Sequence, residues 1–388
     1  MIAVIADDLT GAAELAGIGL DYHLKTEVNT TVEINCNADL LIIATDTRSL
    51  KATEAKTKVH ELTRQVMALK PHLLYKKIDS ALRGHVLDEV SSHLEASGLK
   101  RALIIPGNPE HGKRVVNGTY YYKNIPVHLS NYSVDPDFPA TSSNVRTMLR
   151  ADENLPLFKI NEKIPDAGII VGEAAGVRDL EYWIEQADNN TIIAGASGLF
   201  NRLLKYLIRE KDTAATPTFT QESASRLFVF GSTFHQGRYP IEDTLINNVP
   251  VVYLPIELLG NDNMPQHLYE SFTGSVVQSL KKHRNTIIAI HPDITKGIYI
   301  DPVQLTRKMG AIVNHINQQA PLHELLIEGG ATAWAILSEL NISKLYPIKQ
   351  LSPGVIRMGI AGNNQLCVTL KPGSYEWPAP VWETTTYS

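Results

Sequence analysis

The sequence predicts an α/β protein with two α/β domains, mainly parallel sheets, and an active site in the cleft between the domains. Short β-branched runs alternate with longer amphipathic stretches from end to end, as in repeated strand–helix–strand units. The length of 388 residues exceeds that of one ordinary domain and suits two. A polar segment at 211–225 interrupts the alternation, which then restarts. We therefore expect domains at 1–210 and 226–388, joined by this linker.

The expected strands are short runs rich in apolar and β-branched residues. Stretches such as 52–70 separate them, and there apolar residues recur every three or four positions, which is typical of amphipathic helices. In the first domain we expect strands at 2–6, 40–45, 72–79, 101–106, 168–173 and 191–197. In the second we expect them at 227–232, 249–255, 286–292, 324–330 and 365–373. Such alternation indicates parallel sheets with helices on both faces.

Two segments depart from this alternation. Residues 211–225 are polar, rich in Thr, Ser and Ala, and contain Pro217, which is typical of a linker. Residues 107–145 contain Pro, Gly, Asn and several Tyr without a clear period. We expect them to form an insertion over one face of the first sheet, either a lid or a hairpin.

The composition disfavours several classes of protein. Hydrophobic residues make up 44% of the chain and charged residues 20%, as in a soluble globular protein. A formal charge of −5 disfavours a nucleic-acid surface. Cys36 and Cys367 are far apart, so neither a disulfide framework nor a zinc cluster is expected. Without a basic leader or an apolar run of membrane-spanning length, we expect a cytoplasmic chain with no membrane partner.

Two adjacent carboxylates, Asp7 and Asp8, follow the first expected strand. In an open parallel sheet, ligands bind at the carboxyl ends of the strands. Carboxylates there are costly to bury unless they are solvated, paired or used. A plainer interpretation is that Asp8 or Thr10 caps the following helix, a common role for both residue types. We expect capping to explain one residue at most and interpret the motif as a site.

A second polar cluster closes the strand at 72–79. Lys76, Lys77, Asp79, Ser80 and Arg83 lie within one turn before the next helix. Cations, a carboxylate and a hydroxyl together suit a small polyhydroxylated anion, because arginine binds carboxylates bidentately and aspartate accepts from hydroxyl groups. A solvated ion-pair cluster is the alternative, and such clusters contribute little to stability. The presence of a similar motif after the first strand favours the functional interpretation.

A third strand end carries Asp46 and Arg48. Since parallel strands end at a shared edge, we expect these groups to converge. The converging residues would be Asp7, Asp8, Asp46, Arg48, Lys77, Asp79 and Arg83. If the 107–145 insertion folds over this edge, His111, with Lys113 or Arg114, would contact a substrate, although a histidine in a loop is more often a surface residue.

The second half contains neither a GxxxxGK[ST] nor a GxGxxG sequence, which disfavours a P-loop enzyme and a dinucleotide-dependent one. It has four glycine-containing turns, at 230–234, 328–332, 352–355 and 371–375. In EGGAT (328–332) a strand ends at Glu328 and Thr332 opens a helix. Free amides and the helix dipole at such a terminus favour a phosphate. Each turn could instead need glycine for its geometry alone, but four together favour phosphate binding.

Together these motifs resemble the four-carbon acid sugar kinase family, whose members phosphorylate threonate-type or 3-oxo-tetronate acids with ATP. The resemblance covers nearly the whole chain and rests chiefly on IADDLTGA (5–12) followed by KKIDSALRG (76–84). PGNPEHGKRVVNGTYY (106–121), FGSTFHQ (230–236), GGAT (329–332), SPGV (352–355) and LKPGSY (370–375) follow in the family's order. It implies an ATP-dependent kinase that uses Mg²⁺ and a sugar acid. The first domain would bind the acid and the second the nucleotide.

The resemblance and the motifs assign roles to individual residues. Asp8 is the first choice, and Asp79 the second, to accept the proton of the attacking hydroxyl. Arg48 and Arg83 would bind the substrate carboxylate. The expected substrate-binding residues are Asp7, Arg48, Lys77, Ser80, Arg83 and His111. The expected ATP-binding residues are Ser232, Gly329, Gly330, Ala331, Thr332, Gly354 and Gly373, and no side chain is assigned to the metal.

One departure from the family pattern supports a different hypothesis. GGAT stands where GGET or GGDT is usual, so an acidic side chain is missing at Ala331. The alternative is therefore a non-catalytic protein that binds sugar acids, or a regulatory one, with a degraded ATP site. A dehydrogenase or ligase is disfavoured because no dinucleotide fingerprint is present. The chain could also form a homodimer.

Overall fold

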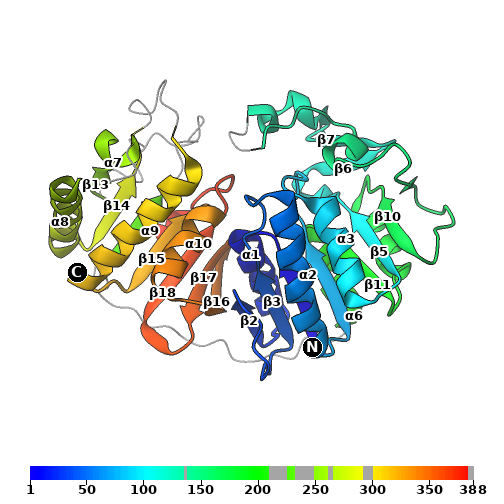
Figure 1. The fold of residues 1–388 in the computed structure, drawn as a ribbon, viewed down its shortest axis with the longest axis horizontal. Coiled ribbons are helices and arrows are strands. Elements are labelled where there is room, and N and C mark those ends of the chain that lie inside the picture. The colour runs from blue at the N-terminus through cyan, green and yellow to red at the C-terminus, as the bar shows by residue number, and fades with distance from the viewer. Residues whose placement is uncertain (135–137, 209–224, 232–248, 261–264, 292–299, 383–388) are drawn as a thin grey trace. The chain divides into compact units, whose positions relative to one another are not determined.

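A computed structural model describes residues 1–388 apart from 135–137, 209–224, 232–248, 261–264, 292–299 and 383–388 (Figure 1). The chain divides into two compact units, an N-terminal unit of Met1–Ala214 and a C-terminal unit of Ala215–Ser388. Each holds a largely parallel sheet with helices, so the predicted α/β class is confirmed. Apart from Ser225, the predicted linker lies outside the described residues.

The sheet of the N-terminal unit is entirely parallel, in the order β2-β3-β1-β4-β11-β5-β10-β9. Its strands are β1 (Ile2–Ala6), β2 (Thr26–Asn29), β3 (Leu40–Ala44), β4 (Leu73–Lys77), β5 (Arg101–Ile105), β9 (Leu157–Phe158), β10 (Gly168–Gly172) and β11 (Thr191–Gly195). β1 lies between β3 and β4, and their last residues, Ala6, Ala44 and Lys77, are in register. The three predicted motifs therefore begin at one edge of one sheet.

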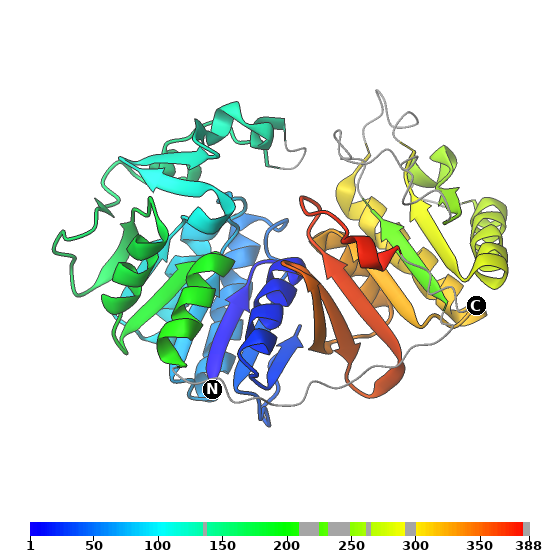
Figure 2. The same ribbon diagram turned by 180° about the vertical axis from the view of Figure 1, so that it is seen from behind.

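Helices cover both faces of this sheet (Figures 1 and 2). They are α1 (Leu9–Asp21), α2 (Ala52–Ala68), α3 (Val86–Ser97), α5 (Val177–Glu185) and α6 (Ser197–Leu207). α2 packs against α3 on one face, while α6 packs against α1 and α5 on the other. β1, β3, β5 and β11 are buried along their whole length, as expected for central parallel strands between two helical layers.

The predicted insertion is a hairpin rather than a detached lid. β6 (Lys113–Val116), β7 (Thr119–Tyr122) and β8 (Ile125–Pro126) form an antiparallel sheet. The short helices η1 (Pro109–His111), η2 (Val127–Leu129), η3 (Asn131–Val134) and α4 (Val145–Met148) surround it. Val115, Tyr120 and Val127 are fully buried in the same hydrophobic core as β1 and β3. The hairpin is therefore an integral part of the N-terminal unit.

The sheet of the C-terminal unit is mixed, in the order β13-β14-β12-β15-β18-β17-β16. The first five are parallel and β16 and β17 are antiparallel additions. The strands are β12 (Arg226–Phe230), β13 (Val251–Tyr253), β14 (Asn285–Ala289), β15 (Glu324–Glu328), β16 (Lys344–Ser352), β17 (Val355–Ile360) and β18 (Asn363–Lys371). The helices are α7 (Ile256–Gly260), α8 (Gln266–His283), α9 (Pro302–Gln319) and α10 (Gly330–Glu339), and η4 (Ala379–Val381) lies near the end.

None of the helices in the described part of the chain combines the length and the apolar character needed to cross a membrane.

Candidate functional site

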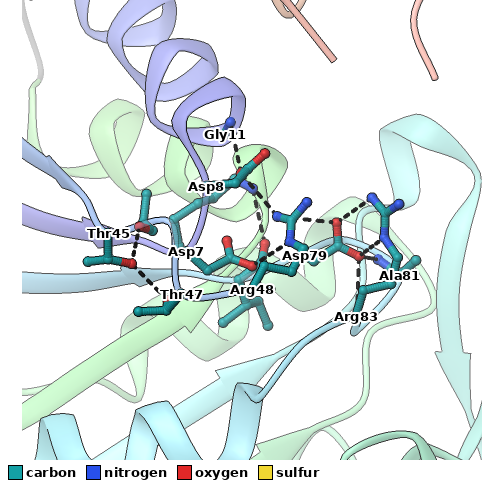
Figure 3. Close-up of polar contacts among 12 residues, drawn as sticks. Asp7, Asp8, Gly11, Thr45, Thr47, Arg48, Asp79, Ala81 and Arg83 are labelled. Atoms are coloured by element: carbon teal, nitrogen blue, oxygen red, sulfur yellow. Dashed lines mark hydrogen bonds and ion pairs between the residues drawn. The ribbon is translucent and has the colours of Figure 1, made fainter. Parts of the chain in front are cut away.

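Arg48 is the centre of a polar cluster at the carboxyl edge of β1, β3 and β4 (Figure 3). Its Nε lies 2.9 Å from Asp7 Oδ2, and its Nη2 lies 3.0 Å from Asp8 Oδ1. The same Nη2 lies 3.6 Å from Asp79 Oδ1. These carboxylates are almost fully buried, and their repulsion would be costly without the shared cation. The structure thus brings Arg48 and the three aspartates together, as the sequence predicts.

Asp8 both caps α1 and belongs to the cluster. Its Oδ1 accepts a hydrogen bond from the Gly11 amide at 3.0 Å, and its Oδ2 accepts one from the Thr10 hydroxyl at 2.5 Å. Gly11 allows this approach, because a Cβ there would lie 2.5 Å from Asp8 Oδ1. Burial acts to raise the pKa of Asp8, but Arg48, Lys77 and the Thr10 bond outweigh it, so the pKa is lowered. Asp8 is therefore ionised.

Asp79 organises the turn that follows β4. Arg83 binds it bidentately, with Nε 2.9 Å from Oδ2 and Nη2 2.7 Å from Oδ1. The Ala81 and Arg83 amides also donate to Oδ2, at 2.8 and 3.2 Å. Burial opposes ionisation, but Arg83 and Arg48 hold the pKa of Asp79 well below its usual value. The carboxylate is therefore a fixed anion that holds the turn.

Asp46 lies in the loop between β3 and α2, and its neighbours tie that loop to β1. Thr45 Oγ1 donates to the Ala6 carbonyl at 2.9 Å, and the Thr47 amide donates to the Asp7 carbonyl at 3.0 Å. Asp46 itself adopts a left-handed backbone with φ of 50°.

Burial raises the pKa of Asp46 to about 7, with the negative charges of Asp8 and Asp7 adding to the effect and Lys58 and Arg48 opposing it. A raised folded-state pKa means that ionisation of Asp46 costs stability as pH rises from about 4 to 7. Asp46→Asn is therefore expected to stabilise the protein by about 2 kcal/mol above pH 7, allowing for partial exposure. Asn tolerates the left-handed backbone. Unfolding measured by calorimetry should show this gain shrinking toward zero near pH 4, and a gain that is equal at all pH values would contradict the assignment.

The two lysines at the end of β4 point to opposite faces of the sheet. The Lys77 ammonium donates to the Ile78 carbonyl at 3.0 Å and lies beneath the start of α1, 3.1 Å from the position a Gly11 Cβ would take. Lys76 instead forms a buried ion pair with Glu89 of α3 at 2.5 Å. Lys77, which the sequence places among the converging residues, and Lys76, which it does not, are thus separated by strand alternation.

Lys76→Met is expected to destabilise the N-terminal unit by about 3–5 kcal/mol, since Glu89 would remain buried without a partner. The double variant Lys76→Met/Glu89→Leu should recover most of that loss, because an apolar pair needs no solvation. Lys56→Met is the matched control, as it breaks a solvent-exposed ion pair with Asp88, which lies on the same helix, α3, as Glu89, and should cost under about 1 kcal/mol. Calorimetric unfolding measures all three, and equal effects of the buried and exposed changes would contradict this prediction.

The remaining substrate residues predicted in the N-terminal unit separate into two groups. Ser80 joins the cluster: its hydroxyl accepts from the Lys113 ammonium, and its carbonyl accepts from the Tyr120 hydroxyl. His111 is exposed in η1, whereas Lys113, like Tyr120, forms a hydrogen bond from the insertion to the Asp79 turn. Tyr120 thus positions Ser80 through its hydroxyl group.

In the C-terminal unit, the EGGAT turn forms the start of α10. Gly329 caps the helix with φ of 94°, a conformation that favours glycine. Ala331 is exposed and Thr332 is buried in the first turn. A Cβ on Gly231, directly after β12, would lie 2.1 Å from Thr332 Oγ1, so Gly231 packs closely against the first turn of α10. The free amides of Gly330 and its successors make this terminus suitable for a phosphate.

The other predicted nucleotide residues have different settings. Gly354 lies in the hairpin between β16 and β17 with φ of 77°, where a Cβ would lie 2.1 Å from the Tyr375 ring. Gly373 follows β18 and faces open space, since no atom lies within 4 Å of its Cβ position. Ser232 lies outside the described residues. Their contact with ATP stays a prediction.

A charged pair beside these turns escaped the sequence interpretation. Glu328 Oε2 lies 2.9 Å from the Lys371 ammonium, which also donates to the Tyr375 carbonyl at 2.6 Å. Burial lowers the pKa of Lys371, and Glu328 opposes that shift. The sequence signal for this pair is a charged residue directly before each glycine turn, in EGGAT and KPGSY.

Comparison with known proteins identifies the family. A family model described as a sugar-binding N-terminal domain matches residues 2–203, more than half of the chain. A D-threonate kinase of Salmonella typhimurium is 25% identical over 373 residues, which cover 87% of this chain and 86% of that protein. The chain belongs to the four-carbon acid sugar kinase family. The family predicted from the motifs is thereby confirmed.

Two further comparisons extend over nearly all of the chain. A 3-oxo-tetronate kinase of Methylobacterium radiotolerans, within the same family, is 26% identical over 410 residues, or 96% of each chain. A crystal structure of a Salmonella typhimurium protein matches with a TM-score of 0.75 at 18% identity, covering 97% of this chain and 96% of that one. This structural likeness shows that the fold is shared.

Proposed function

We propose that the protein is an ATP-dependent kinase that phosphorylates a hydroxyl of a four-carbon sugar acid of the threonate, erythronate or 3-oxo-tetronate type. The observation that carries the proposal is the cluster of Asp7, Asp8 and Asp79 around Arg48 at the carboxyl edge of the sheet. Ionised carboxylates at such an edge can accept hydrogen bonds from several hydroxyl groups of one small substrate. The names of the relatives, D-threonate kinase and 3-oxo-tetronate kinase, support the same substrate class.

The cluster provides both recognition and a proton acceptor in this proposal. Asp7 Oδ1 is buried and has no hydrogen-bond partner among the described residues, so a substrate hydroxyl would satisfy it. Asp8 is ionised and is our first choice to accept the proton of the attacking hydroxyl, with Asp79 second. Phosphoryl transfer depends mainly on positioning the substrates and on neutralising charge. A fixed cluster of this kind would position the sugar acid.

The nucleotide would bind to the C-terminal unit. The α10 terminus would hold phosphate oxygens through backbone amides, as in other glycine-rich helix starts. Mg²⁺, which neutralises phosphate charge, takes most of its ligands from phosphates and water and needs only one or two carboxylates. In the described ranges no three His, Cys, Asp or Glu side chains are placed so that together they could hold a metal ion. Glu328, at the strand end before the turn, is the carboxylate suited to serve as a single Mg²⁺ ligand. The predicted position of the active site, between the domains, stays a prediction.

An ATP-consumption screen tests the proposal directly. Purified protein with Mg-ATP would be assayed against D- and L-threonate, D- and L-erythronate and their 3-oxo derivatives. Turnover of at least one acid is expected, and turnover of none would contradict the proposal. Calorimetric titration with Mg-ATP separates the non-catalytic alternative, because the absence of nucleotide binding at millimolar concentration would favour a sugar-acid sensor. Light scattering after size-exclusion chromatography tests the predicted homodimer.

A further inference from the structure

The cations near Asp79 differ in whether they form ion pairs with the aspartates of the cluster. Arg48 contacts all three carboxylates, and Arg83 contacts Asp79 through two nitrogens. Both guanidinium groups are therefore engaged in holding the protein's own aspartates. A substrate carboxylate that bound to those same nitrogens would compete with the aspartates, and each broken contact would leave a buried aspartate less compensated.

In the described part of the chain, the ammonium groups of Lys77 and Lys113, beside this cluster, donate hydrogen bonds only to neutral oxygens. Lys77 donates to the Ile78 carbonyl, and Lys113 donates to the Ser80 hydroxyl. Within the described ranges, neither lysine lies at ion-pair distance from a carboxylate. Both side chains are nearly buried, with 4% and 8% of each residue exposed. A buried ammonium without a counterion favours the binding of an anion.

The two lysines differ in what surrounds them. Lys77 lies under the start of α1, close to Gly11. Lys113 reaches the Asp79 turn from the hairpin, and its partner Ser80 is partly exposed. The Ser80 hydroxyl accepts from Lys113 and so keeps its own hydrogen to donate. The Tyr120 hydroxyl fixes the Ser80 main chain by donating to its carbonyl. Lys113 and Ser80 thus present two donors to one anion.

We infer that Lys113 binds the carboxylate of the sugar acid, with the Ser80 hydroxyl as a second donor, while Arg48 and Arg83 hold the aspartates in place. The inference rests on the proposed function, whose substrate is an acid. It changes the roles expected from the sequence, in which the two arginines bind the carboxylate.

The acid should bind only while Lys113 carries its proton. Burial lowers the pKa of Lys113 to about 8, and nearby charges modify that effect. The charged and titratable groups that face it are Asp79 and Arg83 from the β4 turn, Glu14 from α1, Tyr122 from β7 and Tyr132 from η3. Affinity for the acid should therefore be full below about pH 8 and fall as pH rises through that value. Arg at position 113 would stay protonated and remove this dependence.

Calorimetric titration of the full chain without ATP tests the inference. The ligands are D-threonate and D-erythronate, and threitol and erythritol serve as equivalents without the carboxylate. Lys113→Met should weaken binding of the acids about 10- to 100-fold, the range for a hydrogen bond to a charged group, and leave the alditols unchanged. Lys113→Arg should restore most of the affinity and make it constant between pH 7 and 9.5. Lys123→Met is the matched control, because it removes an exposed lysine of the same hairpin.

Each result distinguishes this inference from the proposed function. Wild-type affinity for the acids in a folded Lys113→Met protein, or a loss in turnover alone, would overturn the assignment of Lys113. Equal weakening of acids and alditols would also overturn it, because the carboxylate would not be the group recognised. If the wild-type protein binds the acids with this pH dependence but phosphorylates none, the kinase proposal fails and the assignment of Lys113 stands.

Discussion

Arg48→Met is expected to lower the free energy of unfolding of the N-terminal unit by about 3–5 kcal/mol and to abolish detectable phosphorylation of the sugar acid. Asp7, Asp8 and Asp79 would lose the cation they share. Their buried negative charges would then repel one another, and the carboxylates that are expected to bind hydroxyl groups would move apart or take up protons. The loss therefore combines stability and substrate binding, which distinguishes Arg48 from a residue with only one of these roles.

The pH dependence provides a sharper test of this mechanism. In the wild type, the lowered pKa values of Asp8 and Asp79 contribute stability above about pH 4, and this is lost as pH falls through the folded-state values. The difference between wild type and Arg48→Met should therefore be largest near neutral pH and narrow in acid. Arg64→Met, an exposed change on α2, should leave stability and activity unaltered. A difference from wild type that does not vary with pH would contradict the shared-cation account.

The edge that carries the cluster could be predicted from the sequence because its strands are continuous apolar runs. The runs at 2–6 and 40–45 predicted β1 and β3, and parallel pairing then aligned their ends. β16 and β17 could not be predicted in the same way. Pro347 and Lys349 interrupt the apolar pattern of β16, and its pairing with β17 has register shifts at those positions. Its place in the sheet depends on a hairpin with β17, and the interrupted apolar pattern gives no sign of that pairing.

Residue types and strand ends were sufficient to predict that Asp7, Asp8 and Arg48 lie together. They could not predict which side chains pair with one another. Asp8 shows the limit clearly, since it both caps α1 and pairs with Arg48, and the sequence presented these as competing roles. The reach of Lys113 to Ser80 depends on the burial of the hairpin in the core, and residues 107–145 have no period from which that packing could be inferred.

Asp8→Asn is expected to lower kcat about 10²- to 10⁴-fold while leaving the fold largely intact. Asn is as good a helix cap as Asp, so the bond from the Gly11 amide can persist and the change removes mainly the charge. The lone pairs of the carboxylate favour this residue as the proton acceptor. Asp8 Oδ2 accepts one hydrogen bond in the described structure, from Thr10, and retains capacity for a substrate hydroxyl.

Asp79 is the second candidate for the proton acceptor, and its hydrogen bonds differ from those of Asp8. Its Oδ2 already accepts three hydrogen bonds and its Oδ1 accepts one from Arg83, so it has little capacity left for a substrate proton. Asp79→Asn should therefore reduce stability first, because it weakens the bidentate pair that fixes the turn. Asp88→Asn on α3, where the side chain is 41% exposed, is the control for loss of a carboxylate. Steady-state kinetics and melting curves compare the three variants. Unchanged turnover in Asp8→Asn, together with a large loss of kcat in a fully stable Asp79→Asn, would reverse the assignment of the proton acceptor.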